Sequence, residues 1–140
     1  MKFSILQGVA FGTLVYWLIQ ISFYDASVQF SWMLQDPLSA VLLCLIYPVT
    51  EEFLFRGVIQ GYLLNHRLGP TSKLGISVAN IVTTMLFFAL HWIGRSLTVA
   101  SLVIGPSLIL GVVREKTDSL VAPMLVHIVW NVSWYSLIVT

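Results

Sequence analysis

Long apolar runs separated by short polar breaks make up most of this chain. The runs occupy residues 3–23, 38–64, 74–92, 97–113 and 119–139. Each is close to the roughly 20 residues that an α-helix needs to cross the hydrocarbon core of a bilayer. Because the runs are continuous and do not alternate with polar residues, helices are favoured over the strands of a membrane barrel. The pattern predicts an all-α fold, a polytopic membrane helix bundle of about five transmembrane helices.

The composition agrees with this pattern. Of the 140 residues, 58% are hydrophobic and only 9% are charged, whereas about 25% of the residues in ordinary soluble domains are charged. A small soluble domain leaves much of its surface facing water, so we expect membrane lipid around this chain. No repeat or low-complexity linker divides the sequence, which predicts a single membrane domain over residues 1–140. The first apolar run shows no cleavage site of small residues, and we interpret it as a retained helix.

Charge and cysteine content exclude several classes of protein. The net charge is only +1 and the basic residues are scattered, so the positive surface that holds a phosphate backbone is missing and no nucleic-acid partner is expected. The single cysteine, Cys44, can build neither a disulfide framework nor a thiolate zinc site.

The cations in the polar breaks predict an orientation. Five of them can lie together on the cytoplasmic side, where short loops are enriched in Lys and Arg; they are Lys2, Arg67, Lys73, Arg114 and Lys116. Only Arg95 then lies on the opposite side. We therefore expect the N-terminus in the cytoplasm.

Three ionisable residues stand near the middle of the second run: Glu51, Glu52 and Arg56. A charge at mid-membrane costs about 2.5 to 3.5 kcal/mol on insertion scales, so such residues indicate a function by default. Glu52 and Arg56 are spaced i, i+4 and can form an ion pair on one helical face, while Glu51 points about 100° away. Pro48 can loosen the helix before them. The structural alternative is an ion-paired helix interface in which the other glutamate is protonated.

Two further pairs of residues lie one helical turn apart in later runs, Phe87 with His91 and His127 with Asn131. Taken alone, His91 fits an interfacial residue at a helix end, and the second pair fits interhelical hydrogen bonding, worth about 0.6 kcal/mol in membranes. His66 stands beside Arg67 in a basic loop and is expected on the surface.

In order and spacing, these residues resemble the three motifs EExxxR, FxxxH and HxxxN of the CAAX prenyl protease and bacteriocin-processing family. The resemblance covers about residues 41–139, which would be the protease core. It implies a glutamate-dependent intramembrane endopeptidase that acts on a membrane-anchored protein or a peptide, and that could remove a C-terminal sorting tail. We expect such a protein in a bacterial inner membrane.

The resemblance also implies a role for each motif residue. Glu51 would be the general base and His91 its partner, with Glu52 and Arg56 in support. His127 and Asn131 would donate hydrogen bonds to the tetrahedral intermediate. Hydrolysis of an amide requires a base that activates water, hydrogen-bond donors for the oxyanion and a site that excludes bulk solvent.

Two other hypotheses remain open at this stage. Two histidines and a glutamate could hold zinc, although the His-Glu-x-x-His arrangement of zinc proteases is absent and the resemblance implies no metal cofactor. A non-enzymatic protein, either a proton relay or a bacteriocin immunity protein, could use the same polar residues. Straight helices would also leave Glu51, His91 and His127 at different depths, so a shared site requires tilted or kinked helices.

Overall fold

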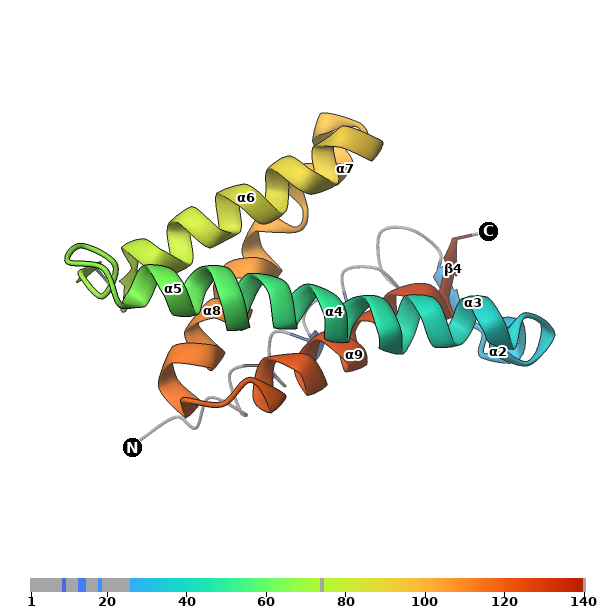
Figure 1. Ribbon diagram of the computed structural model, residues 1–140. Coiled ribbons are helices and arrows are strands. Elements are labelled where there is room, and N and C mark those ends of the chain that lie inside the picture. Colours follow the sequence, from blue (N-terminus) through green and yellow to red (C-terminus); the bar gives the residue numbers. More distant parts are fainter. Residues whose placement is uncertain (1–8, 10–12, 15–17, 19–25, 74, 140) are drawn as a thin grey trace. The chain divides into compact units, whose positions relative to one another are not determined.

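The computed structural model describes residues 9, 13, 14, 18, 26–73 and 75–139 (Figure 1). The structure is mostly helical, 81%, which confirms the helical class expected from the apolar runs. It divides into two compact units, residues 50–124 and residues 1–49 with 125–140. The predicted first span, residues 3–23, lies outside the described residues apart from four isolated positions.

The unit that contains both ends of the chain is built from short elements before one long helix. These elements are β1 (Ala26–Val28), α2 (Ser31–Gln35), α3 (Pro37–Val41), the π-helix η1 (Leu42–Ile46), the start of α4 (Tyr47–Glu52), most of α9 (Val121–Ser136) and β4 (Leu137–Val139). β1 pairs antiparallel with β4. Asp36 caps α3, because its side chain accepts a hydrogen bond from the Ser39 amide at 3.1 Å. Hydrogen bonding by the Ser39 side chain, and then by the Ser39 amide, stabilises the ionised carboxylate and lowers the pKa of Asp36.

The other unit is a group of packed helices with one short hairpin. Its elements are the end of α4, the π-helix η2 (Phe53–Gln60), α5 (Gly61–Leu64), β2 (Ser72–Lys73), β3 (Ile76–Ser77), α6 (Val78–Gly94), α7 (Leu97–Ser101), α8 (Ile104–Thr117) and the start of α9. The β2–β3 hairpin reverses the chain, so that α6 packs against η2 and α8 (Figure 1). Ser77 caps α6 by accepting a hydrogen bond from the Asn80 amide at 3.0 Å.

Two helical segments are long and apolar enough to cross a membrane, Pro37–Leu64 and Leu97–Thr117. Only 22% and 28% of their apolar windows are buried within the protein, whereas the core helix of a soluble protein would be mostly buried. They correspond to the predicted runs 38–64 and 97–113. The runs 74–92 and 119–139 form the shorter helices α6, with 17 residues, and α9, with 16.

The helices of the 50–124 unit expose apolar side chains and bury polar ones. On η2, Phe53 and Val58 are exposed while Arg56 and Gln60 are fully buried. α6 repeats the pattern, because its buried polar residues are Asn80, Thr83 and Thr84. Its exposed large apolar residues are Val78, Ile81, Val82, Met85, Leu86, Leu90, Trp92 and Ile93. A helix in water would show the opposite arrangement. These surfaces are those of a membrane protein.

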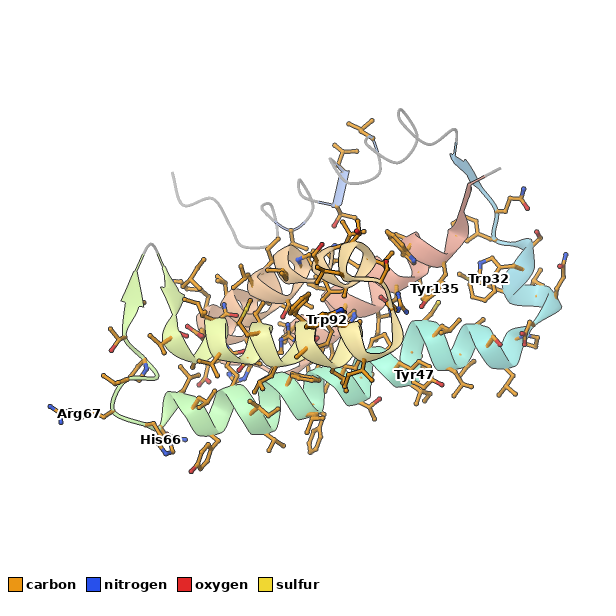
Figure 2. The ribbon with its side chains drawn as sticks, turned by 90° about the horizontal axis from the view of Figure 1, so that it is seen from above. Trp32, Tyr47, His66, Arg67, Trp92 and Tyr135 are labelled. Atoms are coloured by element: carbon orange, nitrogen blue, oxygen red, sulfur yellow. The ribbon has the colours of Figure 1, made fainter. Side chains whose placement is uncertain are left out.

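The connection between α5 and α6 carries the polar residues of this end of the unit. His66 and Arg67 are both exposed, and the Arg67 side chain points away from the helices (Figure 2). This confirms the prediction that His66 is a surface residue.

Candidate active site

The centre of the 50–124 unit is an ion pair between Glu52 and Arg56. The Arg56 Nε lies 3.2 Å from the Glu52 Oε2, and both side chains are fully buried. The i, i+4 pairing expected from the sequence is confirmed. Because neither charge reaches water, each stabilises the other, and removing one would leave the partner uncompensated.

Groups on two other helices also contact the Arg56 guanidinium, although its Nη1 has no hydrogen-bond partner among the described residues. Its Nη2 donates hydrogen bonds to the Ser107 carbonyl at 2.9 Å and to the Ser107 hydroxyl at 2.8 Å. Its central carbon lies 5.1 Å from the centre of the Phe87 ring, within the range of a cation–π contact. The positive charge is therefore met by a carboxylate, two oxygen acceptors and a ring face from three different helices.

Phe87 lies between Arg56 and His91. Its ring makes an edge-to-face contact with Phe55, with centroids 4.9 Å apart, and a tilted contact with the His91 imidazole, with centroids 4.3 Å apart. The phenyl ring is buried, so its neighbours fix its orientation. Through this ring, the position of the guanidinium constrains the position of the imidazole.

The tautomer of the His91 imidazole follows from its contact with the backbone. The imidazole Nδ1 lies 2.9 Å from the Phe87 carbonyl oxygen. A carbonyl only accepts hydrogen bonds, so Nδ1 carries the proton, and in the neutral imidazole Nε2 is left as an acceptor. His91 is thereby prepared to accept a hydrogen bond from water.

An open pocket of about 230 Å³ lies beside this cluster. It is lined by Glu51, Leu90, His91, Gly94 and Arg95. The volume is far above the roughly 10–15 Å³ that one water needs. Glu51 is half-buried whereas Glu52 is fully buried, so the two neighbouring glutamates have different surroundings, as their helical positions predict. The pocket brings together a carboxylate, an imidazole and a guanidinium.

The last predicted pair of site residues lies on α9 in the other compact unit. His127 is buried, and Asn131 is half-buried. The Asn131 carboxamide donates a hydrogen bond from Nδ2 to the Leu43 carbonyl of η1 at 2.9 Å. The convergence of this pair with Glu51 and His91 stays a prediction.

Few side chains in the described part of this protein are placed to bind a metal ion. Across residues 26–73 and 75–139, no group of three or more His, Cys, Asp or Glu side chains is close enough to hold an ion. In the pocket the donors of the kind that zinc prefers are the Glu51 carboxylate and the His91 imidazole. The zinc hypothesis stays untested.

Comparison with known proteins identifies the family. Residues 31–133 match the family model described as type II CAAX prenyl endopeptidase Rce1-like. The chain belongs to this family. Neither curated proteins nor solved structures gave a match. Members of this CAAX endopeptidase family are proteases, and the match covers all three motifs noted in the sequence.

The three motifs include Glu51 and His91, which line the pocket, but they do not include most of the other polar residues packed between the helices of the 50–124 unit. Seven buried or half-buried polar residues line the packed faces of η2, α6 and α8: Gln60, Ser77, Asn80, Thr83, Thr84, Ser107 and Glu115. None of these seven residues belongs to the three motifs noted in the sequence. A signal exists, because Asn80, Thr83 and Thr84 follow helical spacing within an apolar run and therefore share one face.

Proposed function

We propose that this chain is a glutamate-dependent intramembrane endopeptidase that hydrolyses a peptide bond of a membrane-associated protein or peptide. The observation that carries the proposal is that Glu51 and His91, from two different helices, line the same pocket. A general base and a hydrogen-bond acceptor around one water are what direct hydrolysis of an amide requires.

The chemical step uses Glu51 as the base. The Glu51 carboxylate takes a proton from a water in the pocket, and the water oxygen attacks the carbonyl carbon of the substrate. The Nε2 atom of His91 accepts the second hydrogen of the water and orients it. When the carbon–nitrogen bond breaks, Glu51 returns its proton to the leaving amine, so it acts first as a base and then as an acid.

The oxyanion of the tetrahedral intermediate needs hydrogen-bond donors. We assign this role to His127 and Asn131. The Asn131 carboxamide has two N–H groups, and the bond to the Leu43 carbonyl holds one of them. The other can point at the oxyanion, so the contact with η1 would fix the direction of the donor. No metal ion is required in this scheme.

The surrounding architecture in this proposal is a polytopic bundle of about five spans in a bacterial inner membrane, with the N-terminus in the cytoplasm. The exposed apolar faces of η2 and α6 would contact lipid. A substrate that is itself anchored in the membrane can reach the open pocket from the bilayer. Removal of a C-terminal sorting tail fits such a site.

The experiment compares the wild-type chain with Glu51→Gln, which keeps the size of the side chain and removes the base. Purified full chains in proteoliposomes are given a farnesylated peptide ending in a CAAX sequence and the same peptide without the lipid. In parallel, mass spectrometry follows the C-termini of membrane proteins in cells. We expect the variant to lose about 10²- to 10⁴-fold in rate, the usual contribution of a general base.

The matched control is Asp118→Asn, because Asp118 is an exposed carboxylate at the end of α8. It should cleave at the wild-type rate. Identical sets of termini in cells with wild type and Glu51→Gln, together with no cleavage of either peptide, would contradict proteolysis and leave a binding protein as the better description.

A further inference from the structure

A chain of hydrogen bonds leads away from the buried Arg56 through side chains outside the three family motifs. Arg56 donates to the Ser107 hydroxyl at 2.8 Å, and the Ser107 hydroxyl donates to the Thr84 hydroxyl at 3.0 Å. Thr84 donates to the Asn80 Oδ1 at 3.3 Å, and the Asn80 Nδ2 donates to the Leu108 carbonyl at 2.9 Å. The chain therefore runs from η2 to α8, across to α6 and back to α8.

The direction of every bond in this chain is fixed. A guanidinium can only donate, so the Ser107 oxygen must accept from Arg56, and the Ser107 hydrogen must go elsewhere. Thr84 is the acceptor of that hydrogen, and the Thr84 hydrogen then goes to Asn80. Since each hydroxyl both accepts and donates, the loss of one member leaves both of its neighbours incompletely bonded.

We infer that Thr84 is a positioning residue of the proposed protease, acting through Ser107 on the guanidinium of Arg56. The inference rests on the proposed function for its effect on the rate. Thr84 is fully buried and does not line the pocket. By holding the Ser107 hydroxyl in one rotamer, it places the guanidinium at Glu52 and against the Phe87 ring.

The route from Thr84 to the pocket is short and made of direct contacts. Arg56 packs against Phe87, and Phe87 packs against the His91 ring with centroids 4.3 Å apart. A valine at position 84 fills the same space but provides no acceptor, so the Ser107 hydroxyl must rotate to bond elsewhere. The guanidinium then keeps the Ser107 carbonyl but loses the second of its two Ser107 acceptors, and the ring stack that orients the His91 imidazole loosens.

The neighbouring Thr83 provides a matched control. It lies on the same helix and is equally buried, with 1% of its surface exposed. Within the described part of the chain, the Thr83 hydroxyl has no hydrogen-bond partner. Thr83→Val and Thr84→Val therefore make the same chemical change in the same kind of environment, and only Thr84→Val interrupts the chain to Arg56.

The first experiment measures kcat and KM on the farnesylated peptide in proteoliposomes, with rates expressed per folded protein. Thr84→Val should lower kcat about threefold, the factor that matches the loss of one interhelical hydrogen bond of about 0.6 kcal/mol in a membrane. KM should not change, because Thr84 does not touch the substrate. Thr84→Ser, which keeps the hydroxyl, should restore the rate, and Thr83→Val should behave as wild type. Equal kcat values for Thr83→Val and Thr84→Val would overturn the inference.

A second experiment needs no substrate. Dicyclohexylcarbodiimide modifies carboxyl groups within membranes, and mass spectrometry reports the labelled residue. Glu52 should be protected in wild type and in Thr83→Val, because Arg56 holds it. It should be labelled at least several times faster in Thr84→Val. Ser107→Ala, which removes the next oxygen of the chain, should expose Glu52 in the same way and serves where Thr84→Val does not fold.

The two experiments separate the two ideas. Changed labelling of Glu52 without cleavage of any peptide by wild type would refute the proposed function and leave the control of Arg56 by Thr84 intact. Unchanged labelling in both Thr84→Val and Ser107→Ala would overturn the inference even if wild type cleaves the peptide.

Discussion

Two arginine–carboxylate pairs with the same i, i+4 spacing make the energetics of the site testable. Arg56 with Glu52 is fully buried on both sides, whereas Arg114 with Asp118 leaves 20% of the arginine and 96% of the aspartate exposed. At the observed 3.2 Å and an effective dielectric constant near 20, the buried pair attracts by about 5 kcal/mol. Removing one partner of a buried pair typically costs about 3–5 kcal/mol, because the other charge is left without compensation.

We therefore expect Arg56→Met to lower the free energy of unfolding by about 3–5 kcal/mol. Arg114→Met should lower it by less than about 1 kcal/mol, as exposed pairs do. The double variant Glu52→Gln with Arg56→Met carries no uncompensated charge and should recover much of the loss.

The assay is unfolding of the purified chain in mixed micelles by titration with sodium dodecyl sulfate, followed by circular dichroism. The three variants are compared with wild type in the same lipid and detergent. Equal losses for Arg56→Met and Arg114→Met would refute the reasoning, since burial would then make no difference. A double variant no more stable than Arg56→Met would refute the claim that the uncompensated Glu52 charge causes the loss.

Two other features give predictions with simple measurements. A side chain at Gly111 would overlap the Asn80 carboxamide, so Gly111→Ala should cost about 1–3 kcal/mol in the same titration. The cost should fall when Asn80→Ala is present, because the overlapping carboxamide is then gone. If the free-energy losses of Gly111→Ala and Asn80→Ala simply add in the double variant, overlap with Asn80 is not the cause of the Gly111→Ala loss. Because Glu51 activates water without a metal in the proposed mechanism, dialysis against a strong chelator should leave peptide cleavage unchanged, whereas loss of cleavage that zinc restores would favour the zinc alternative.

The apolar runs predicted the helices well but not all of their ends. The run 97–113 was expected to stop before Arg114, because charged residues usually mark the end of a span. The helix continues to Thr117, since Arg114 pairs with Asp118 one turn later, and it ends where Asp118 takes a left-handed conformation with φ of 47°. The last residues of the run 119–139 are also apolar, but Leu137–Val139 forms β4, because a short apolar run fits a strand as well as a helix.

The local part of the site could be predicted from spacing alone. The ion pair of Glu52 with Arg56 and the contact of Phe87 with His91 each lie within one helical turn, and both are observed. The placement of Glu51 and His91 at one pocket was expected from the family motifs. The partners of Arg56 on the other helices could not be predicted, because Ser107 lies 51 residues away along the chain. Only the packing of helices decides which of several small polar residues meet.

The magnitudes indicate what these polar contacts contribute. A charge such as that of Arg56 costs about 2.5–3.5 kcal/mol in the middle of a membrane. Interhelical hydrogen bonds in membranes are worth about 0.6 kcal/mol each. The network from Arg56 to Leu108 contains four of them, which together supply about 2.4 kcal/mol. The network therefore roughly offsets the burial of the guanidinium and adds little net stability. What it does provide is one fixed position for Arg56 between Glu52 and Phe87. Because Phe87 also contacts His91, that position helps to align His91 with Glu51. For the proposed protease this alignment matters more than extra stability.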